Sequence, residues 1–433
     1  MFLKPLLVTA IGLATPAAIT DIPLSDQASA PSTVTQQAEP AIVCPETPSP
    51  CVWDRTYGGN RADRIQTIVP DGDGGFFVAG HTKSTGKGDF DTWVMRVDRA
   101  GEPVWKRTFG TKGVDRMFSA DTTSDGGLIV AGHTTTLLGK GIDFWVLRLA
   151  ADGRLFWQRT YGGRGIERAH AVKALPDGGA VVAGFTNSKG AGDRDGWLIR
   201  LDAAGKLLWD RTFGDRRDDG FNAMALQRDE DTGDVAGITL AGYHQSDRTG
   251  RYRGMVVQVG LDGEQQWQTM VDQGPFTVLT GIAASPDGGV AAAGVTQDDN
   301  SIRDNVIVVG LDPHGDARWQ KDLRGDRDDS VWSIQPQPGG GYALAGSTSS
   351  RGAGSSDAWV IGLTGNGALD WFRLYGGSQW DQTLALAISP DGGMALAGYT
   401  TSRGAGQEDG WILRLDSRGN LGHGETAIGQ AAQ

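Results

Sequence analysis

The sequence predicts an all-β fold, a seven-bladed β-propeller with four antiparallel strands in each blade. The first observation is a repeated phrase, Trp-x-Arg-Thr followed by Tyr or Phe and then Gly, which begins at Trp53, Trp105, Trp157 and Trp209 and has looser copies at Trp267, Trp319 and Trp371. The second is a nearly constant period, since successive copies lie 52, 52, 52, 58, 52 and 52 residues apart. The third is the presence of 66 glycines among 433 residues, which suits short strands joined by tight turns. Such a period is typical of solenoids and propellers, and four strands per period favour the propeller.

Each repeat contains four strand signals in a fixed order. In the first repeat we predict strands over Arg64–Val69, Phe76–Thr82, Asp91–Asp98 and Pro103–Phe109. Aspartate and glycine fill the connection between the first two strands, and these residues tolerate the positive φ angles of hairpin turns. No segment of the repeat has the pattern of a ten-residue amphipathic helix.

The last repeat lacks its fourth strand. The expected tryptophan position holds His423, whereas the chain begins its repeats with an unpaired fourth strand over 52–57. We therefore predict that the N-terminal strand completes the seventh blade and closes the ring, which would remove exposed strand edges. The propeller domain is predicted over 53–419, with a loose tail over 420–433.

The N-terminal region has the composition of an exported protein. Residues 1–20 combine Lys4 with an apolar run and small residues, which predicts a signal peptide, with an uncleaved anchor as the alternative. Residues 21–52 are predicted as a flexible linker that ends in a disulfide loop between Cys44 and Cys51, the only cysteines. A metal or redox role for this pair is the alternative. We expect a periplasmic or extracellular protein with no membrane span in the mature chain.

The charge balance excludes some classes of partner. A net charge of −12 disfavours nucleic acid and anionic membranes, which both need a basic face. No catalytic motif for a serine hydrolase, zinc protease or phosphate loop is present. Carboxylates are plentiful, so an acid–base pair at the central channel stays open. No organic cofactor is predicted, and we expect a monomer.

An acidic residue lies ten positions after the repeat tryptophan in six of the seven repeats. In propeller geometry this position is the entry to the innermost strand, so the acids would form a ring near the channel mouth. One interpretation is a calcium site, because hard cations bind several oxygens; the alternative is that each carboxylate accepts hydrogen bonds from turn amides of its own blade. The six residues are Asp63, Asp115, Glu167, Asp219, Asp329 and Asp381, and Thr277 is the exception.

A second acid precedes the third strand in five repeats. It follows a Gly-x-Gly segment in most copies, but no strand–helix context supports a dinucleotide-binding motif. A single-loop calcium site is a weak interpretation, because the spacing matches no complete calcium loop. These residues are Asp91, Asp143, Asp195, Asp357 and Asp409.

The glycine of each Ala-Gly pair, as in Ala79-Gly80, is expected to allow close approach of backbone between blades. Two features suggest a binding surface. The residue after each Ala-Gly pair varies between repeats and includes His81, His133, Phe185, Tyr243 and Tyr399. Aromatic side chains there would stack on sugars or on apolar groups of a partner, and ordinary surface variation is the alternative. The fourth repeat also carries an arginine-rich loop that would bind an acidic glycan, a carboxylate or a phosphate, or would simply be solvated; it contains Arg248, Arg251, Tyr252 and Arg253.

The repeat resembles those of secreted bacterial propeller proteins, many without known function, over 53–416. The segment Leu201–Trp209 is also similar to the tryptophan-docking motif of quinoprotein-type propellers, which implies girdle-like packing of the tryptophans between blades. This chain has seven repeats where those proteins usually have eight, and it matches no quinone-binding or vicinal-cysteine feature.

Together these observations predict an exported, non-enzymatic binding or scaffold propeller that recognises a protein or glycan partner through its top-face loops. The alternative is a carboxylate-dependent enzyme, a glycan hydrolase or lyase acting at the central channel.

Overall fold

A computed structural model describes residues 51–135, 141–229, 231–246, 248–299 and 303–421. The predicted signal peptide, Cys44 and nearly all of the predicted linker and tail lie outside these residues. The described chain forms 28 β-strands, and none of its residues is helical. The predicted all-β fold class is therefore confirmed.

The strands fall into four groups according to their place in the repeat. The first strands are β2 (Asp63–Pro70), β6 (Asp115–Thr122), β10 (Glu167–Ala174), β14 (Asp219–Arg228), β18 (Phe276–Ala284), β22 (Asp329–Pro336) and β26 (Asp381–Ile388). The second strands are β3 (Phe76–Thr82), β7 (Leu128–Thr135), β11 (Ala180–Thr186), β15 (Val235–Gln245), β19 (Val290–Gln297), β23 (Tyr342–Thr348) and β27 (Met394–Thr400).

The third strands are β4 (Asp91–Val97), β8 (Ile142–Leu149), β12 (Asp195–Leu201), β16 (Tyr252–Val259), β20 (Asn305–Leu311), β24 (Asp357–Leu363) and β28 (Asp409–Leu415). The fourth strands are β5 (Pro103–Phe109), β9 (Leu155–Tyr161), β13 (Leu207–Phe213), β17 (Gln265–Val271), β21 (Ala317–Leu323), β25 (Leu369–Tyr375) and β1 (Trp53–Tyr57).

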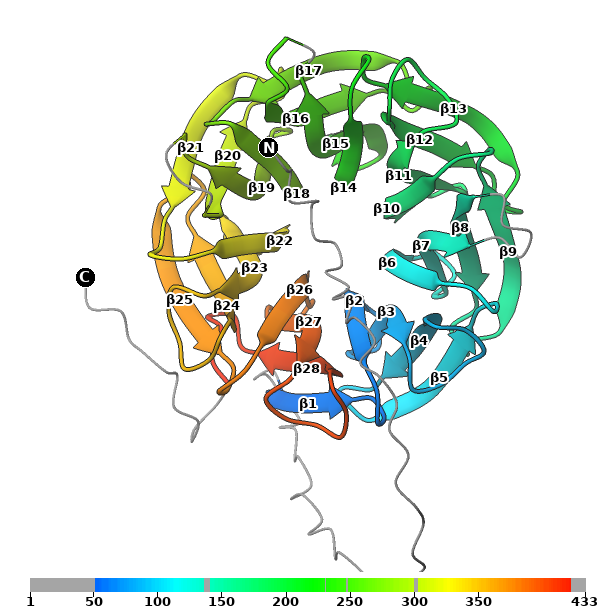
Figure 1. Cartoon of the computed structure of the whole chain (residues 1–433), viewed down its shortest axis with the longest axis vertical. Coiled ribbons are helices and arrows are strands. Elements are labelled where there is room, and N and C mark those ends of the chain that lie inside the picture. Colours follow the sequence, from blue (N-terminus) through cyan, green and yellow to red (C-terminus); the bar gives the residue numbers. More distant parts are fainter. Residues whose placement is uncertain (1–50, 136–140, 230, 247, 300–302, 422–433) are drawn as a thin grey trace, which may run out of the picture. The chain divides into compact units, whose positions relative to one another are not determined.

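One first, one second, one third and one fourth strand together form an antiparallel sheet. Figure 1 shows these sheets as blades whose first strands lie innermost. Blades one to six are β2–β5, β6–β9, β10–β13, β14–β17, β18–β21 and β22–β25, and blade seven is β26–β28 with β1. A single parallel bridge between Tyr252 and Phe276 joins blades four and five. The predicted seven-bladed fold with four antiparallel strands per blade is thus confirmed.

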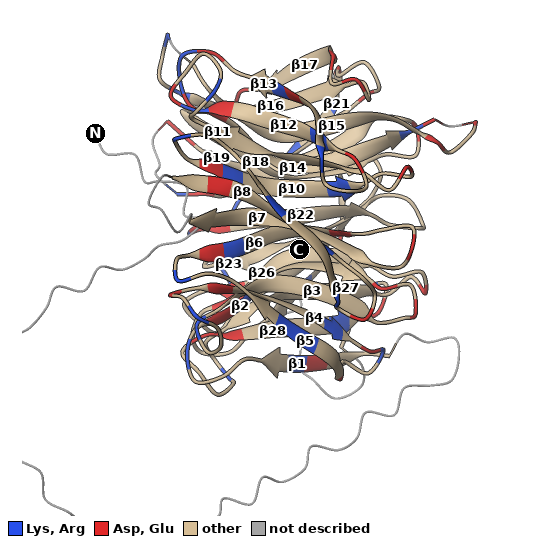
Figure 2. Cartoon of the chain, turned by 90° about the vertical axis from the view of Figure 1, so that its right-hand side faces the viewer, with Lys and Arg blue, Asp and Glu red and all other residues tan. Residues whose placement is uncertain are grey.

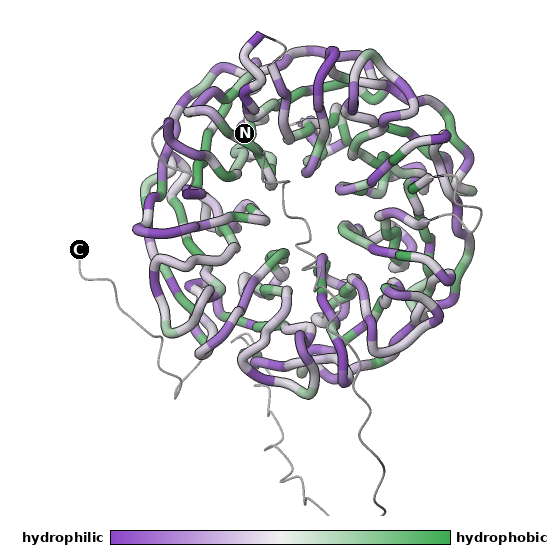
Figure 3. Tube along the Cα trace, viewed as in Figure 1, coloured by the Kyte–Doolittle hydropathy of each residue, from purple (hydrophilic) through white to green (hydrophobic). Residues whose placement is uncertain are grey.

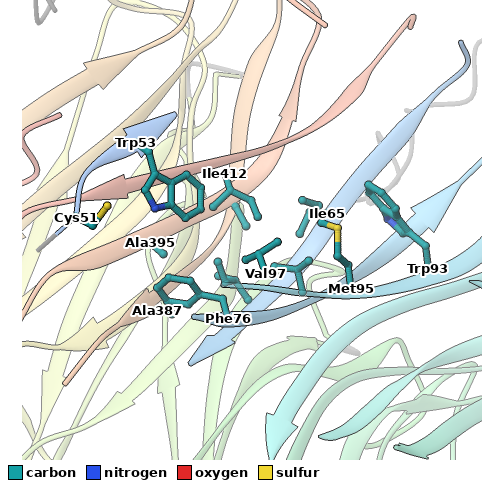
Figure 4. Packing of buried hydrophobic residues seen from close by; sticks show 13 residues of the cluster. Cys51, Trp53, Ile65, Phe76, Trp93, Met95, Val97, Ala387, Ala395 and Ile412 are labelled. Carbon is teal, nitrogen blue, oxygen red and sulfur yellow. The ribbon is translucent and has the colours of Figure 1, made fainter. Parts of the chain in front are cut away.

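Strand β1 pairs antiparallel with β28, from Trp53 opposite Arg414 to Tyr57 opposite Gly410. Figure 1 shows the two strands side by side although they come from opposite ends of the described chain. A hydrophobic cluster joins this blade to blade one, and Figure 4 shows Trp53 and Ile412 near Phe76. The N-terminal strand therefore occupies the fourth-strand position that the last repeat lacks.

The hydrophobic core lies in the middle of the blades. Nearly every residue of the second and third strands is buried, because these strands have a neighbour on both sides and a blade against each face. The fourth strands alternate between exposed and half-buried residues. Figure 3 shows the same division, with hydrophobic segments in the strands and hydrophilic segments prominent in the loops.

The repeat tryptophan packs against the following blade. Trp53 of β1 donates its indole N–H to the carbonyl oxygen of Arg99 in blade one at 2.9 Å, and Trp105, Trp157 and Trp267 make the equivalent bond to the next blade. The ring lies on Gly101, where φ is +81° and a Cβ atom would come within 3.1 Å of the indole. The contact recurs at six further pairs: Trp105–Gly153, Trp157–Gly205, Trp209–Gly263, Trp267–Gly315, Trp319–Gly367 and Trp371–Gly419.

The Ala-Gly pair has a different role from the one predicted. We expected its glycine to allow a close approach between blades, but a Cβ on Gly80 would lie 2.0 Å from the carbonyl oxygen of Arg64 in the first strand of the same blade. The reason is a bulge in β2 between Ile65 and Thr67, which pushes the first strand toward the second. The same bulge occurs in every blade.

The ends of the propeller add two details. Cys51 is buried in the cluster around Trp53, and its pairing with Cys44 stays a prediction because Cys44 lies outside the described residues. Asn420 closes the last turn through its backbone N–H to Asp416 at 2.8 Å, and Leu421 packs on the core. The packed chain therefore extends at least two residues into the segment predicted as a loose tail.

Candidate functional site

The top face is the side on which the first and third strands begin and the second and fourth strands end. In blades one to three of the propeller, the second residue of the innermost strand is an arginine: Arg64 in β2, Arg116 in β6 and Arg168 in β10. We call these three residues the arginine row. Figure 2, which shows the sheets from the side, places many of the charged residues in loops and at strand ends toward the two faces.

One end of the arginine row, Arg64, is neutralised by an acid. Arg64 donates two hydrogen bonds to the carboxylate of Glu408 in blade seven, at 2.6 and 2.7 Å, and its guanidinium lies 4.2 Å from the ring centre of Tyr399. Near the other end, Arg194, which directly precedes β12 in the same blade as Arg168, approaches Asp218 at 3.9 Å, so this carboxylate pairs with Arg194 and not with Arg168. Arg116 and Arg168 are therefore the unneutralised part of the row.

Arg116 and Arg168 have no carboxylate within ion-pair distance among the described residues. Arg116 is only 5% exposed and stacks on Phe90 at 4.3 Å, and its Nε has no hydrogen-bond partner within the described chain. Burial, together with Arg64 and Arg168, lowers the pKa of Arg116 to about 10. The Nε of Arg168 is likewise buried and unpartnered in this part of the chain, and burial and Arg194 lower its pKa.

Two neutral histidines support the arginine row from the second strands. His81 pairs with Arg64 across β2 and β3, and His133 pairs with Arg116 across β6 and β7. Burial is the main reason that both imidazole pKa values lie well below the usual value, and the nearby arginines lower them further. The Nδ1 atoms of both rings lack a hydrogen-bond partner within the described residues. Two uncharged imidazole rings thus lie on the strands next to the arginine row.

The predicted recognition residues lie below the surface of the top face. All are second-strand residues, and their exposed fractions run from 1 to 7% for His81, His133, Phe185, Tyr243 and Tyr399. Two of them contact residues of the first strands. The ring of Tyr399 packs against the guanidinium of Arg64, and Phe185 packs on His170 with ring centres 5.7 Å apart. A direct ligand contact by these side chains stays a prediction, and their observed contacts are to the residues that surround the row.

The ring acids are held within their own blades. Asp63 accepts hydrogen bonds from the Gly59 amide at 2.8 Å, from Ser84 at 2.6 Å and from the hydroxyl of Thr82. Asp115, Glu167, Asp329 and Asp381 accept equivalent bonds from a turn amide or from the threonine nineteen positions later. These contacts favour the hydrogen-bonding alternative over a shared calcium site, which stays untested.

The second acids hold the loop before the third strand. Asp91 accepts hydrogen bonds from the amides of Lys87 and Gly88 at 2.9 and 2.8 Å. The bonds recur at Asp195, Asp357 and Asp409. A Cβ on Gly86, whose φ is +124°, would lie 2.2 Å from Asp91, which explains the Gly-x-Gly segment without a ligand.

Blade four departs from this plan. The threonine position next to its ring acid holds His244, whose Nδ1 lies 2.6 Å from Oδ1 of Asp219. Burial is the main cause that raises the pKa of Asp219 to about 6; Asp215 adds to the shift, and the Asp215 amide and His244 oppose it. The six extra residues of this repeat mainly lengthen the first hairpin's strands, since β14 has 10 residues and β15 has 11.

The arginine-rich loop of blade four is partly neutralised. Arg251 pairs with Asp299 at 3.0 Å and Arg253 pairs with Asp272 at 3.0 Å. Tyr252 is buried and donates its hydroxyl to Asp218 at 3.3 Å, whereas Arg248 is exposed. The loop therefore offers less uncompensated positive charge than its composition predicts.

Sequence reasoning missed the arginine row and the pair formed by Asp215 and His244. The repeat carried signals for both. An arginine directly follows the ring acid in the first three repeats alone, and the residue nineteen positions after that acid, allowing for the six-residue insertion, is threonine in every repeat except the fourth.

The chain resembles known propeller structures in fold. It is similar to a puromycin hydrolase mutant complexed with PGG, with 14% identity, a TM-score of 0.51 and coverage of 85% of this chain and 55% of that chain. It is also similar to the WD40 domain of Neurospora crassa Pan2, with 12% identity, a TM-score of 0.48 and coverage of 84% and 91%. The β-propeller domain of the trilobed protease from Pyrococcus furiosus gives 8% identity, a TM-score of 0.48 and coverage of 83% and 93%.

These likenesses concern the fold and assign no activity to this chain. The sequence matches no protein-family profile, and no curated protein sequence matches it. Within the described ranges no helix has the length and apolar character needed to cross a membrane.

Proposed function

We propose that the protein is an exported, non-enzymatic binding propeller whose top face recognises a protein or glycan partner that carries anionic groups. The arginine row is the part of the top face that contacts the anion. The observation that supports this proposal is a pair of neighbouring arginines, the buried Arg116 and the half-buried Arg168, whose Nε atoms are buried without a partner and which no carboxylate of the described chain neutralises.

Buried cations without partners are costly, so they need a reason. A charged side chain removed from water loses several kilocalories per mole of solvation unless it is paired. The chain as a whole has 52 acidic and 40 basic residues, so acids are abundant, and they do pair with Arg64 at Glu408 and with the nearby Arg194 at Asp218. An incoming carboxylate, sulfate or phosphate would supply the missing partner of Arg116 and Arg168 through charge-assisted hydrogen bonds.

The enzyme alternative has less support. It requires carboxylates free to exchange protons or to attack at the channel, but the ring acids accept hydrogen bonds from threonine hydroxyls and turn amides of their own blades. A scaffold role without a small ligand would give no reason for the buried guanidinium groups.

The test compares a variant that lacks two arginines of the row with a control variant that lacks two arginines elsewhere on the propeller. The double variant R116Q/R168Q removes two inner arginines, and R107Q/R159Q removes two exposed arginines from the outer strands β5 and β9. Both variants change the net charge equally. Binding of polygalacturonate, heparin and poly-glutamate would be measured by calorimetry, with a neutral glucan as the uncharged probe.

We expect at least one anionic probe to bind the wild-type protein and to lose affinity by about 100-fold in R116Q/R168Q, because each charge-assisted hydrogen bond contributes about 1.5–3 kcal/mol. The outer double variant should retain affinity within about threefold. Equal binding by the two double variants, or binding of the neutral glucan alone, would contradict the proposal.

A further inference from the structure

Two residues distinguish the top of blade four from the same place in the other six blades. The position four residues before the ring acid holds Asp215, where the other repeats have Gly59, Thr111, Gly163, Gln273, Gly325 and Gly377. The threonine position holds His244, where the others have Thr82, Thr134, Thr186, Thr296, Thr348 and Thr400. Both changes introduce a side chain that binds metals, and both occur beside the same carboxylate.

The three side chains converge in space. His244 Nδ1 lies 2.6 Å from Oδ1 of Asp219, and His244 Nε2 lies 3.8 Å from Oδ2 of Asp215. One ligand atom from each residue can be chosen so that all three lie within 4.8 Å of one another. Ligands bound tetrahedrally at about 2.1 Å are separated by about 3.4 Å, so modest side-chain movement brings the three atoms onto one ion.

We propose that Asp215, Asp219 and His244 form a binding site for a divalent transition-metal ion of the zinc type. The site lies at the top of blade four, on β14 and β15 and on the segment between Phe213 and Asp219. It is separate from the proposed anion-binding function, and neither depends on the other.

The ligand set indicates the class of metal. One imidazole nitrogen with two carboxylate oxygens suits zinc and neighbouring transition metals, whereas calcium prefers a larger set of oxygens and no nitrogen. Water would complete the coordination from the solvent side, because the Asp215 side chain is 44% exposed whereas Asp219 is fully buried.

The surroundings fix the orientation of the ligands. The Asp215 amide donates to Oδ2 of Asp219 at 2.8 Å, so the segment that carries Asp215 is attached to the buried acid. The Arg217 amide donates to Oδ1 of Asp215 at 3.2 Å and leaves Oδ2 toward His244. The His244 ring therefore lies between the two carboxylates, with one of them beside each ring nitrogen.

The other six blades act as internal controls. They have the same backbone and, in five of them, a buried acid, but threonine and an uncharged residue occupy the two variable positions. The variants H244T and D215G therefore restore residues that this fold already accepts at equivalent positions. H314A serves as a control because it removes an exposed histidine from another blade.

The experiment is a calorimetric titration of the untagged full chain, freed of metal by a chelator, with zinc ions alone. We expect one ion per chain, a loss of affinity of about 100-fold or more in H244T and in D215G, and unchanged binding in H314A. Zinc should also raise the melting temperature of the wild-type protein and of H314A but not that of H244T.

Three results would overturn the proposal: no zinc binding by the wild-type protein, binding of equal strength in H244T, or loss of binding in H314A. If H244T fails to fold, D215G decides the question, because Asp215 is a half-exposed loop residue whose replacement leaves the buried pair intact.

Discussion

Blades one to three and blade four share one hydrogen-bonded arrangement at their top, which we call the frame, but they place side chains of opposite charge beside it. In all of them a buried acid begins the innermost strand and a side chain of the second strand binds it, through Thr82, Thr134 or Thr186 in the first three blades and through His244 in the fourth. The next residue is arginine in the first three blades, whereas Gly220 follows in blade four with Asp215 and Asp218 nearby.

The difference shows how a repeat protein acquires local chemistry. The hydrogen bonds of the frame need only an acid, a side-chain donor on the second strand and a turn amide, so the neighbouring positions are free to vary. Changing two or three of them converts the top of a blade from cationic to acidic without altering the strands. Function is then expected at positions that differ between blades, and stability at positions that recur.

The largest expected effect concerns the frame itself. D63A should lower the free energy of unfolding by about 3 kcal/mol, because it leaves the buried donors Gly59 N–H, Thr82 and Ser84 without an acceptor. In blade five the position holds Thr277, which bonds to the carbonyl oxygen of Gln273 at 2.6 Å, so T277A should cost only about 1 kcal/mol. Urea unfolding with equal m-values would measure both. Equal losses would mean that the acid has no special place in the frame.

The second effect is a pH dependence of stability that arises from buried histidines in blades one to three. His81, His133 and His170 are held neutral by burial, with the pKa of His170 lowered to about 4 by burial and by Arg168. Unfolding returns these pKa values to about 6.5, so the unfolded chain binds more protons and stability falls as the pH drops from about 6.5 toward 4. Each histidine contributes a slope of up to about 1.4 kcal/mol per pH unit.

Burial is the largest cause of the lowered histidine pKa values, and neighbouring basic groups lower them further. His81 is affected by Arg116, Arg64, His133 and Lys83, and His133 by Arg168, Arg116 and His170. The variant H133F should flatten the acid limb of a stability–pH curve, while H314A, which changes an exposed histidine, should leave it unchanged. A curve that is identical in wild type and H133F would show that His133 is not held neutral.

The sequence was sufficient to predict the frame because the frame is local and repeated. The first-blade strands agree with the prediction to within one residue at their ends, since hairpin turns and apolar runs leave direct traces in the chain. The role of Gly80 was predicted wrongly, because it depends on a bulge in the facing strand that no residue type marks.

The site was harder to predict for a related reason. His81 and Tyr399 vary between repeats, so they were taken for surface residues, but cross-strand pairing buries them beneath the arginines. Arg116 directly follows the acid Asp115, and adjacency in the sequence does not show whether the two side chains pair. The acid is instead bound to Thr134, which leaves the arginine without that partner.

A smaller effect tests how the row is positioned. Phe90 lies between two cations, with Arg116 at 4.3 Å and Lys83 at 4.2 Å from its ring centre. F90A changes no charge but removes a cation–π contact worth about 1 kcal/mol, so affinity for the anionic probe should fall by about fivefold. F156A, in the exposed outer strand of blade two, is the matched control. An unchanged affinity in F90A would remove Phe90 from the account of the row while leaving Arg116 in place.

The smallest effect is expected where blade four is returned to the common plan. In the presence of a chelator, H244T should change the free energy of unfolding by less than about 1 kcal/mol, because a threonine hydroxyl satisfies the buried acid in the other blades. The reverse change in blade two, T134H, should cost about 1–3 kcal/mol, since a larger ring must enter a packed position next to Asp115. If H244T instead destabilises the metal-free protein as much as T134H does, the histidine belongs to the frame of blade four, and the contrast between the two regions lies in charge alone.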